Sequence, residues 1–171
     1  MEIDNTLLIE RSKQGDSYAF SQLYSVYATD LFRFSMYMMG SYHDAEDAVQ
    51  EAVFSAWRNI HTLKDPAYFK VWLFKILSNR CKTELMKKNK HADSLPVEEY
   101  EFLMDGEDFS FDSAELKEAL QSLTPPDGQI ILLSVIGGFK SEELAAIYSM
   151  PASTIRSRQK RALEKLRVIL S

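Results

Sequence analysis

Cysteine, histidine and long apolar runs are all scarce in this sequence. A single cysteine, Cys81, excludes an internal disulfide and any zinc site built from several cysteines. The three histidines, His43, His61 and His91, are far apart, and none has the spacing of a metal-ligand pair. No apolar run approaches the roughly 20 residues that span a bilayer. We therefore expect no cofactor, no metal and no stable membrane insertion, and we expect a cytoplasmic location.

Motifs of common enzyme classes are missing as well. The sequence has no Gly-rich phosphate loop, no HExxH zinc motif and no GxSxG nucleophile motif. A lone histidine or cysteine is more often structural than catalytic. We therefore expect that the protein is not an enzyme.

Charge is distributed unevenly along the chain, whose formal net charge is −5 over 171 residues. Residues 1–90 carry 12 Lys and Arg against 11 acids, and residues 113–171 carry 8 against 6. The stretch 91–112 carries 8 acids and no Lys or Arg. The acidity is thus confined to one short stretch between two nearly neutral segments.

Helical spacing dominates both flanking segments, so the sequence predicts an all-α protein. The first segment is predicted to hold helices over residues 5–14, 17–40, 42–59 and 67–88, with Asp16 and Ser41 as N-caps. The acidic stretch contains a proline and a glycine and has no helical period, which favours a linker between two small domains. A surface loop of a single domain is the alternative. Aromatic residues in the stretch indicate that part of it docks on another surface.

The sequence ends on PASTIRSRQKRALEKLRVILS, a helix with most of its basic residues on one side. At about 100° per residue, one side is an apolar stripe that comprises Ile155, Ala162, Leu163, Leu166, Ile169 and Leu170. The other side carries Ser153, Arg156, Ser157, Lys160, Arg161 and Glu164. We expect the stripe to be buried and the basic side chains to face solvent.

A short helix over residues 141–148, with Ser141 as its expected cap, precedes the final helix across the tight turn SMP. Short helix, turn and basic helix form the pattern of a helix-turn-helix, whose second helix enters the major groove of DNA. Arg binds guanine bidentately, and Ser or Thr contacts bases or phosphates. The pattern favours DNA binding over a plain solvated helix.

Residues 42–59 have the opposite character, because four acids and no base lie between Asp44 and Glu51. Acids near a helix N-terminus complement its dipole, which is the simplest explanation for them. The predicted outward position of Phe54 among Asp44, Asp47 and Glu51 indicates a protein interface instead.

Residues 67–88 provide a second basic surface, with six basic residues and one acid between Lys75 and Lys90. The helical period predicts that four apolar side chains face inward: Phe69, Leu73, Ile76 and Leu77. It predicts that four polar ones face outward: Lys75, Ser78, Asn79 and Lys82. For Trp72 and Tyr68, stacking on unpaired bases and packing in the core are equally open.

Four segments in series resemble the extracytoplasmic-function group of bacterial RNA polymerase sigma factors: GDSYAFSQLY, AEDAVQEAVFSAW, AYFKVWLFKILSNR and SEELAAIYSMPASTIRSRQKRALEKLR. The resemblance implies an alternative-type sigma factor that binds core RNA polymerase and directs promoter-specific initiation of transcription. It implies a sigma domain 2-like unit over 1–91, an acidic linker over 92–112 and a domain 4-like helix-turn-helix unit over 113–171. It also implies promoter DNA and an anti-sigma factor as partners.

The resemblance further implies three sets of contact residues. The minus-thirty-five element of the promoter is contacted by Ser153, Thr154, Arg156, Ser157, Lys160 and Arg161. The minus-ten element is contacted by Tyr68, Trp72, Lys75, Asn79, Arg80 and Lys82, and residues 61–69 line a pocket for a flipped base. Core polymerase is contacted by Asp44, Asp47, Gln50, Glu51 and Phe54.

Two other classes of protein fit parts of the sequence. A stand-alone helix-turn-helix regulator explains the final helix, but it leaves the acidic surface around Phe54 and the basic surface of residues 67–88 without a role. An interaction protein that sequesters a partner explains the fold, but it does not need two basic surfaces.

Overall fold

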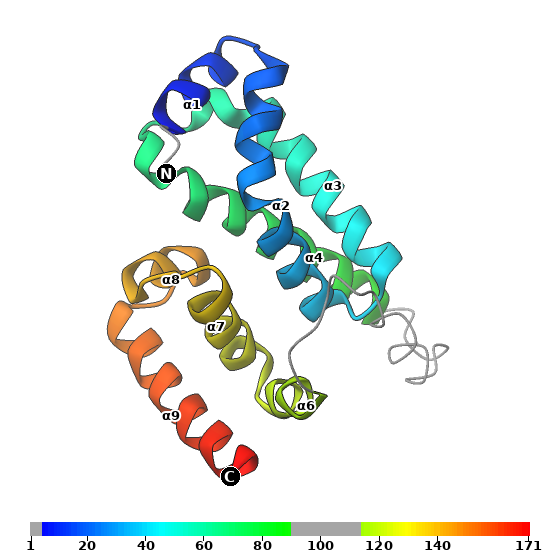
Figure 1. Ribbon diagram of the computed structural model, residues 1–171, viewed down its shortest axis with the longest axis vertical. Coiled ribbons are helices and arrows are strands. Elements are labelled where there is room, and N and C mark those ends of the chain that lie inside the picture. The colour runs from blue at the N-terminus through cyan, green and yellow to red at the C-terminus, as the bar shows by residue number, and fades with distance from the viewer. Residues whose placement is uncertain (1–4, 90–113) are drawn as a thin grey trace. The chain divides into compact units, whose positions relative to one another are not determined.

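The computed structural model describes residues 5–89 and 114–171, and every regular element in these ranges is helical (Figure 1). The predicted all-α class is therefore confirmed. The chain divides into two compact units, Met1–Leu95 and Pro96–Ser171. The predicted linker over 92–112 lies outside the described residues. No helix in the described ranges is long and apolar enough to cross a membrane.

The first unit is a bundle in which α2 packs against α1, α3 and α4, and α3 packs against α4. Its α-helices are α1 (Asn5–Lys13), α2 (Ser17–Met39), α3 (Tyr42–Asn59) and α4 (Phe69–Asn89). Two short 3-10 turns, Ile60–Thr62 and Pro66–Tyr68, connect α3 to α4. The core includes Phe34 and Phe74, whose rings meet edge to face with centroids 6.5 Å apart.

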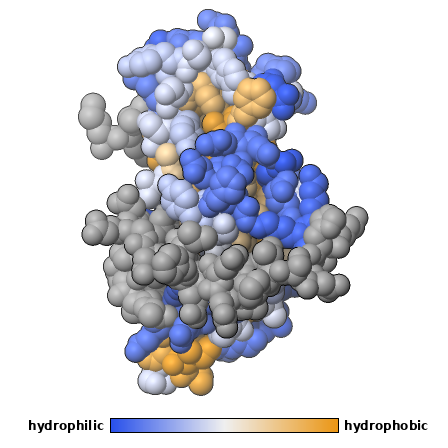
Figure 2. Space-filling model, turned by 90° about the vertical axis from the view of Figure 1, so that its right-hand side faces the viewer, coloured by the Kyte–Doolittle hydropathy of each residue, from blue (hydrophilic) through white to orange (hydrophobic). Residues whose placement is uncertain are grey.

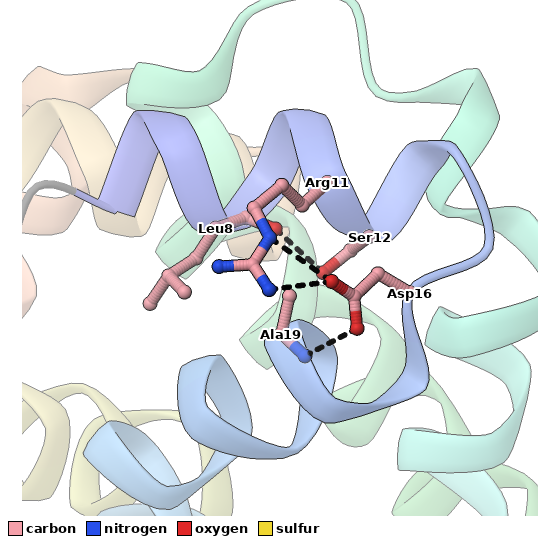
Figure 3. A network of polar contacts seen from close by, with 5 residues as sticks. All are labelled: Leu8, Arg11, Ser12, Asp16 and Ala19. Atoms are coloured by element: carbon pink, nitrogen blue, oxygen red, sulfur yellow. Dashed lines mark hydrogen bonds and ion pairs between the residues drawn. The ribbon is translucent and has the colours of Figure 1, made fainter.

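The turn between α1 and α2 is fixed by Asp16, which caps α2 as the sequence predicts (Figure 3). One carboxylate oxygen accepts the backbone N–H of Ala19 at 3.1 Å, and the other lies 2.7 Å from Nη2 of Arg11. These two contacts lower the pKa of Asp16, with the backbone hydrogen bond as the larger cause. Gly15 supplies the positive φ of +93° that the turn requires.

Helix α3 begins after Gly40, at φ 72°, and its N-cap is Ser41, as expected. The Ser41 hydroxyl accepts the backbone N–H of Asp44 at 3.4 Å. The Asp44 carboxylate forms an ion pair with Lys88 of α4. The local cap fixes the start of α3, and the ion pair links that start to α4.

The second unit consists of α6 (Ala114–Ser122), α7 (Pro125–Ile136), α8 (Ser141–Tyr148) and α9 (Ala152–Leu170). Helix α9 packs against the other three. Three fully buried side chains, Leu133, Leu144 and Ile155, form the centre of the core. In the same unit, the Tyr148 hydroxyl donates to Oε1 of Gln129 at 3.0 Å.

The predicted cap of α8 is wrong by one residue. The N-cap position belongs to Lys140, whose backbone N–H donates to the Glu143 carboxylate at 2.9 Å. The Ser141 hydroxyl instead donates to Gln159 of α9 at 3.3 Å. A tertiary hydrogen bond has therefore replaced the expected local one.

The predicted apolar stripe of α9 is buried only in part. Ile155, Ala162 and Leu166 are buried, but Leu163, Ile169 and Leu170 are each at least 45% exposed. Figure 2 shows hydrophobic surface where α9 ends. Periodicity predicts the side on which apolar residues lie, but burial also needs a neighbouring helix, and none in the described ranges covers this end.

The predicted inner face of α4 also needs a correction. Ser78, which the helical period placed outward, is fully buried at 0% exposure. Phe69, Leu73 and Leu77 are buried as predicted, and Ile76 is half-buried. Because α4 packs against both α2 and α3, its buried face is wider than a single stripe.

Candidate functional site

The outer face of α9 is exposed and basic. Five of the six residues predicted to contact the minus-thirty-five element are exposed: Ser153, Arg156, Ser157, Lys160 and Arg161. Thr154 is half-buried. Arg156 lies 3.5 Å from the Glu142 carboxylate, but both side chains are more than half exposed, so this ion pair holds Arg156 only weakly.

Two other polar residues of α9, which the sequence did not single out as functional, face the body of the unit. Nη1 of Arg158 lies 3.0 Å from Oδ1 of the nearly buried Asp127 on α7. The amide of Gln159 donates to the Ser134 hydroxyl of α7 at 2.7 Å and accepts from Ser141 of α8. Nothing in the basic run of this helix indicates, from sequence alone, that Arg158 is held inward.

The acidic face of α3 is exposed at four of its five predicted polymerase contacts. Asp47, Gln50, Glu51 and Phe54 are exposed, and Phe54 is 57% exposed despite its apolar ring. The guanidinium of Arg58 lies over that ring, 4.5 Å from its centroid. This cation–π contact orients Phe54 on the surface.

The fifth predicted polymerase contact, Asp44, is half-buried and ion-paired with Lys88. Nearby on the same helix, His43 lies 3.4 Å from the Asp47 carboxylate, and Gln50 donates to Glu46 at 3.4 Å. These contacts are exposed, so they leave the carboxylates accessible to a partner.

The predicted minus-ten residues divide by exposure. Tyr68 is 61% exposed, and Lys75, Asn79 and Lys82 are also exposed. Trp72 is half-buried, with its ring centroid 6.0 Å from that of the buried Phe69. The ring of Tyr68 is therefore exposed to solvent, whereas the side chain of Trp72 lies partly in the core and partly at the surface.

Arg80, the sixth residue of this set, lies between two carboxylates. It forms an ion pair with Glu51 of α3, and its Nη2 lies 2.8 Å from Oε1 of Glu84. A groove of about 470 Å³ runs beside it, and its lining includes Phe54 and Asn79. The predicted polymerase and minus-ten sets thus meet at this groove, which the helical period of each helix alone did not indicate.

A second groove, of about 410 Å³, lies at the loop that enters α4. Its lining includes Pro66 and Phe69 from the range predicted to hold a flipped base, but it does not include His61. Asn5 and Tyr27 complete one side, and Nδ2 of Asn5 donates to the Tyr27 hydroxyl at 3.1 Å. The sequence alone does not indicate either residue, because both lie far from this loop along the chain.

The described residues hold no group of His, Cys, Asp or Glu side chains that could bind a metal ion. Cys81 is fully buried and 3.8 Å from the Ser35 hydroxyl.

Two family models match the chain in order. Sigma-70 region 2 matches residues 23–91, and Sigma-70 region 4 matches residues 113–166. The chain is 31% identical over 142 residues to the RNA polymerase sigma factor SigV of Bacillus subtilis, an alignment that covers 83% of this chain and 85% of that protein. The chain belongs to the extracytoplasmic-function sigma factors.

Other members of the family match over nearly the whole length of this sigma factor. The ECF RNA polymerase sigma factor SigW of Bacillus subtilis is 29% identical over 174 residues, with 93% of this chain and 92% of that protein covered. The ECF RNA polymerase sigma-E factor of Escherichia coli K12 is 28% identical over 181 residues, with coverage of 96% and 93%.

A solved structure resembles this sigma factor as well. The sigma factor RpoE of Bartonella quintana, solved in complex with the anti-sigma factor NepR, matches with a TM-score of 0.74 and 26% identity over 88% of this chain and 96% of that one. The predicted family and function are therefore confirmed: the protein is an alternative sigma factor that directs transcription by core RNA polymerase at promoter DNA. The family itself is not catalytic.

Proposed function

We propose that the exposed face of α9 reads the minus-thirty-five element. The proposed contacts are Ser153, Thr154, Arg156, Ser157, Lys160 and Arg161. The single observation that carries the proposal is the one-sided character of α9, whose N-terminal half buries Ile155 and exposes Arg156, Lys160 and Arg161. Arg can bond guanine in the major groove, and Lys can neutralise phosphates.

The minus-ten element is proposed to contact Tyr68, Trp72, Lys75, Asn79, Arg80 and Lys82. Lys75 and Lys82 of α4 are exposed, and so is the ring of Tyr68 in the turn that leads into this helix. These features support the assignment, because unpaired bases stack on rings while cations hold the backbone. The groove at the entrance of α4 is the proposed place of a flipped base, with Phe69 in its lining.

Core polymerase is proposed to contact Asp44, Asp47, Gln50, Glu51 and Phe54 on α3. An apolar ring exposed among carboxylates is typical of a protein interface whose partner is basic at its rim. The interface would combine burial of Phe54 with contacts to the exposed carboxylates of Asp47 and Glu51.

The remaining proposals concern the domains, the absence of catalytic activity, the location and the regulatory partner. Residues 1–91 form the unit for polymerase and the minus-ten element, 92–112 form a linker, and 113–171 form the unit for the minus-thirty-five element. We further propose that the protein has no catalytic activity of its own, acts in the cytoplasm and is regulated by an anti-sigma factor. Support for that last partner comes from the complex of RpoE with NepR.

The test is reconstitution of initiation. Purified protein and core polymerase are added to a promoter library, and the RNA start sites are mapped by sequencing. We expect starts that depend on the protein and that share an upstream and a downstream element at fixed spacing. A stand-alone regulator gives DNA binding without new starts, and that result contradicts the proposal.

A further inference from the structure

The side-chain amide of Gln159 joins three helices of the second unit. Its Nε2 donates to the Ser134 hydroxyl of α7 at 2.7 Å, and its Oε1 accepts from the Ser141 hydroxyl of α8 at 3.3 Å. Both ends of the amide are therefore used, each on a different neighbouring helix.

The orientation of the amide is determined by its neighbours. The Ser134 hydroxyl donates its proton to the backbone carbonyl of Ile130 at 2.9 Å, so towards Gln159 it can only accept. The nitrogen of the amide must then face Ser134, which leaves the oxygen to accept from Ser141. Each group in this series of hydrogen bonds therefore has a single role towards its neighbour, as donor or as acceptor.

This hydrogen-bonded link constrains α9 in a way that its apolar contacts do not. Ile155 and Ala162 are fully buried, but the hydrophobic effect that buries them is non-directional and does not by itself select one roll angle of the helix. Hydrogen bonds weaken steeply when their angles are wrong. Arg158, one position before Gln159, adds a second directional contact through Asp127 at 3.0 Å.

The neighbours of Gln159 along α9 are the residues proposed to contact DNA. Ser157 and Lys160 flank the Arg158–Gln159 pair in sequence, and both are exposed. Side chains extend about 5–6 Å from a helix axis, so a roll of about 10° moves their tips by about 1 Å. Recognition geometry tolerates about 0.5 Å, so the roll of α9 affects which base each side chain can reach.

We propose that Gln159 is a positioning residue that determines promoter specificity by fixing the roll of α9 against α7 and α8. The proposal rests on the proposed reading of the minus-thirty-five element by α9. Gln159 itself faces the body of the unit and acts through Arg156, Ser157 and Lys160.

The test compares Gln159→Met with the unaltered protein in holoenzyme assembled on core polymerase. Met keeps the length and helical propensity of Gln but removes both hydrogen bonds. The holoenzymes select from promoter DNA that is randomised over the upstream element, and the bound fraction is sequenced. Gln121→Met is the matched control, because Gln121 is exposed on α6 and has no proposed role.

We expect Gln159→Met to lower the enrichment of the preferred upstream sequence over single-base variants by roughly tenfold, which is the scale of one well-placed base contact. The dependence of DNA affinity on salt should stay unchanged, because the phosphate-binding cations remain. A purely structural defect lowers the amount of active protein and scales binding to all sequences equally, so it leaves the enrichment ratio unchanged.

Two further variants test whether the loss of enrichment arises from the hydrogen bonds of Gln159. Ser141→Ala removes one hydrogen bond without altering α9, and we expect a loss of roughly threefold in enrichment. If Gln159→Met does not fold, Ser141→Ala provides the test in its place. Adding Ser134→Ala to Gln159→Met should cause no additional loss of enrichment, because Gln159→Met already removes the contact between Gln159 and Ser134.

The proposal is overturned if Gln159→Met selects the same sequence with the same enrichment as the unaltered protein, or if Gln121→Met shows an equal loss. Failure of the proposed function is visible separately, in the unaltered holoenzyme alone. If that holoenzyme shows no preference for any upstream sequence, α9 does not read the minus-thirty-five element. The proposed role of Gln159 is then wrong as well.

Discussion

Arg80 of α4 forms an ion pair with Glu51 of α3. The same guanidinium nitrogen is 2.8 Å from Glu84, and Nε of Arg80 is buried with no hydrogen-bond partner among the described residues. Arg80, a proposed DNA contact, and Glu51, a proposed polymerase contact, therefore restrain each other through this ion pair. A change at either residue should be detectable at both interfaces.

Replacing Glu51 with Gln should affect the two interfaces in opposite directions. The loss of one carboxylate releases Arg80, so binding of the free protein to single-stranded minus-ten DNA should increase by roughly two- to fivefold, the scale of an exposed ion pair. Affinity for core polymerase should decrease, because a proposed contact is lost. Fluorescence anisotropy with labelled DNA and with labelled core polymerase measures both.

Glu84→Gln is the matched control for this prediction. It also removes a carboxylate from Arg80, but Glu84 lies outside the proposed polymerase contacts. DNA affinity should rise as for Glu51→Gln, while polymerase affinity should not change. Unchanged DNA affinity in both variants contradicts the idea that these carboxylates restrain Arg80.

Local hydrogen bonding makes the starts of α2 and α3 predictable from sequence. Asp16 caps α2 by accepting from a residue three positions later, and Ser41 does the same for α3. Such contacts depend only on neighbouring residues and a flexible backbone at Gly15 or Gly40. A sequence pattern therefore contains all of the information they need.

Contacts between helices were not predictable in the same way. Ser141 has the sequence pattern of a cap but bonds Gln159, which is 18 residues away, and Arg80 pairs with a residue of another helix. A helical wheel gives the direction of a side chain relative to its own axis and contains no position for the neighbouring helix. For this reason the helical period predicts an outward Ser78, although Ser78 is fully buried.

Arg156→Ala should change promoter recognition without a measurable change in stability. Arg156 is 56% exposed at its side chain, and its ion pair with Glu142 contributes about 0–1 kcal/mol. If Arg156 contacts a base, discrimination at one position of the upstream element falls by about 1–3 kcal/mol. Selection from randomised promoter DNA measures this loss, and Lys165→Ala, on α9 outside the proposed contacts, is the control. Equal loss in both variants would indicate a non-specific charge effect.

Ser149→Gly should stabilise the second unit. Ser149 ends α8 with φ 53° and ψ 44°, a left-handed conformation that is strained for a residue with a Cβ atom. Glycine adopts it without strain, so we expect the free energy of unfolding to rise by about 1 kcal/mol. Urea unfolding followed by circular dichroism measures the change. The same substitution at Ser153, inside the first turn of α9, should destabilise by up to about 1 kcal/mol.

The buried thiol of Cys81 should make stability depend on pH in the alkaline range. Burial raises its pKa to about 11 from the ordinary value of 9.0. Well below pH 9 the thiol is neutral in the folded and the unfolded chain. Between pH 9 and 11 the unfolded chain loses the proton first, so the free energy of unfolding falls as the pH rises, by up to about 2 kcal/mol.

Tryptophan fluorescence can follow this effect in the first unit, because both tryptophans of the chain, Trp57 and Trp72, lie there. Urea midpoints of the unaltered protein and of Cys81→Ala are compared at pH 8 and pH 10.5. The variant should show the smaller decrease. Tyr37, whose pKa is raised to about 12 by burial, is present in both proteins and cancels. Equal decreases would show that Cys81 keeps its ordinary pKa.

The ion pair between Arg158 and Asp127 should be worth more than the exposed pairs of this protein. The side chain of Asp127 is only 10% exposed, so Arg158→Met leaves a nearly buried carboxylate without its cation. We expect the free energy of unfolding of the second unit to fall by about 2 kcal/mol. Hydrogen exchange of α7 and α9 measures the change without interference from the first unit.

Asp127→Asn completes a double-mutant cycle with Arg158→Met. Asn leaves an amide oxygen that can still accept from Nη1 of Arg158, so this single substitution should cost about 1 kcal/mol. In the double variant the buried group is neutral and no charge is left unpaired, so the combined loss should be smaller than the sum of the single losses. Additive losses would mean that the 3.0 Å contact does not couple the two residues in solution.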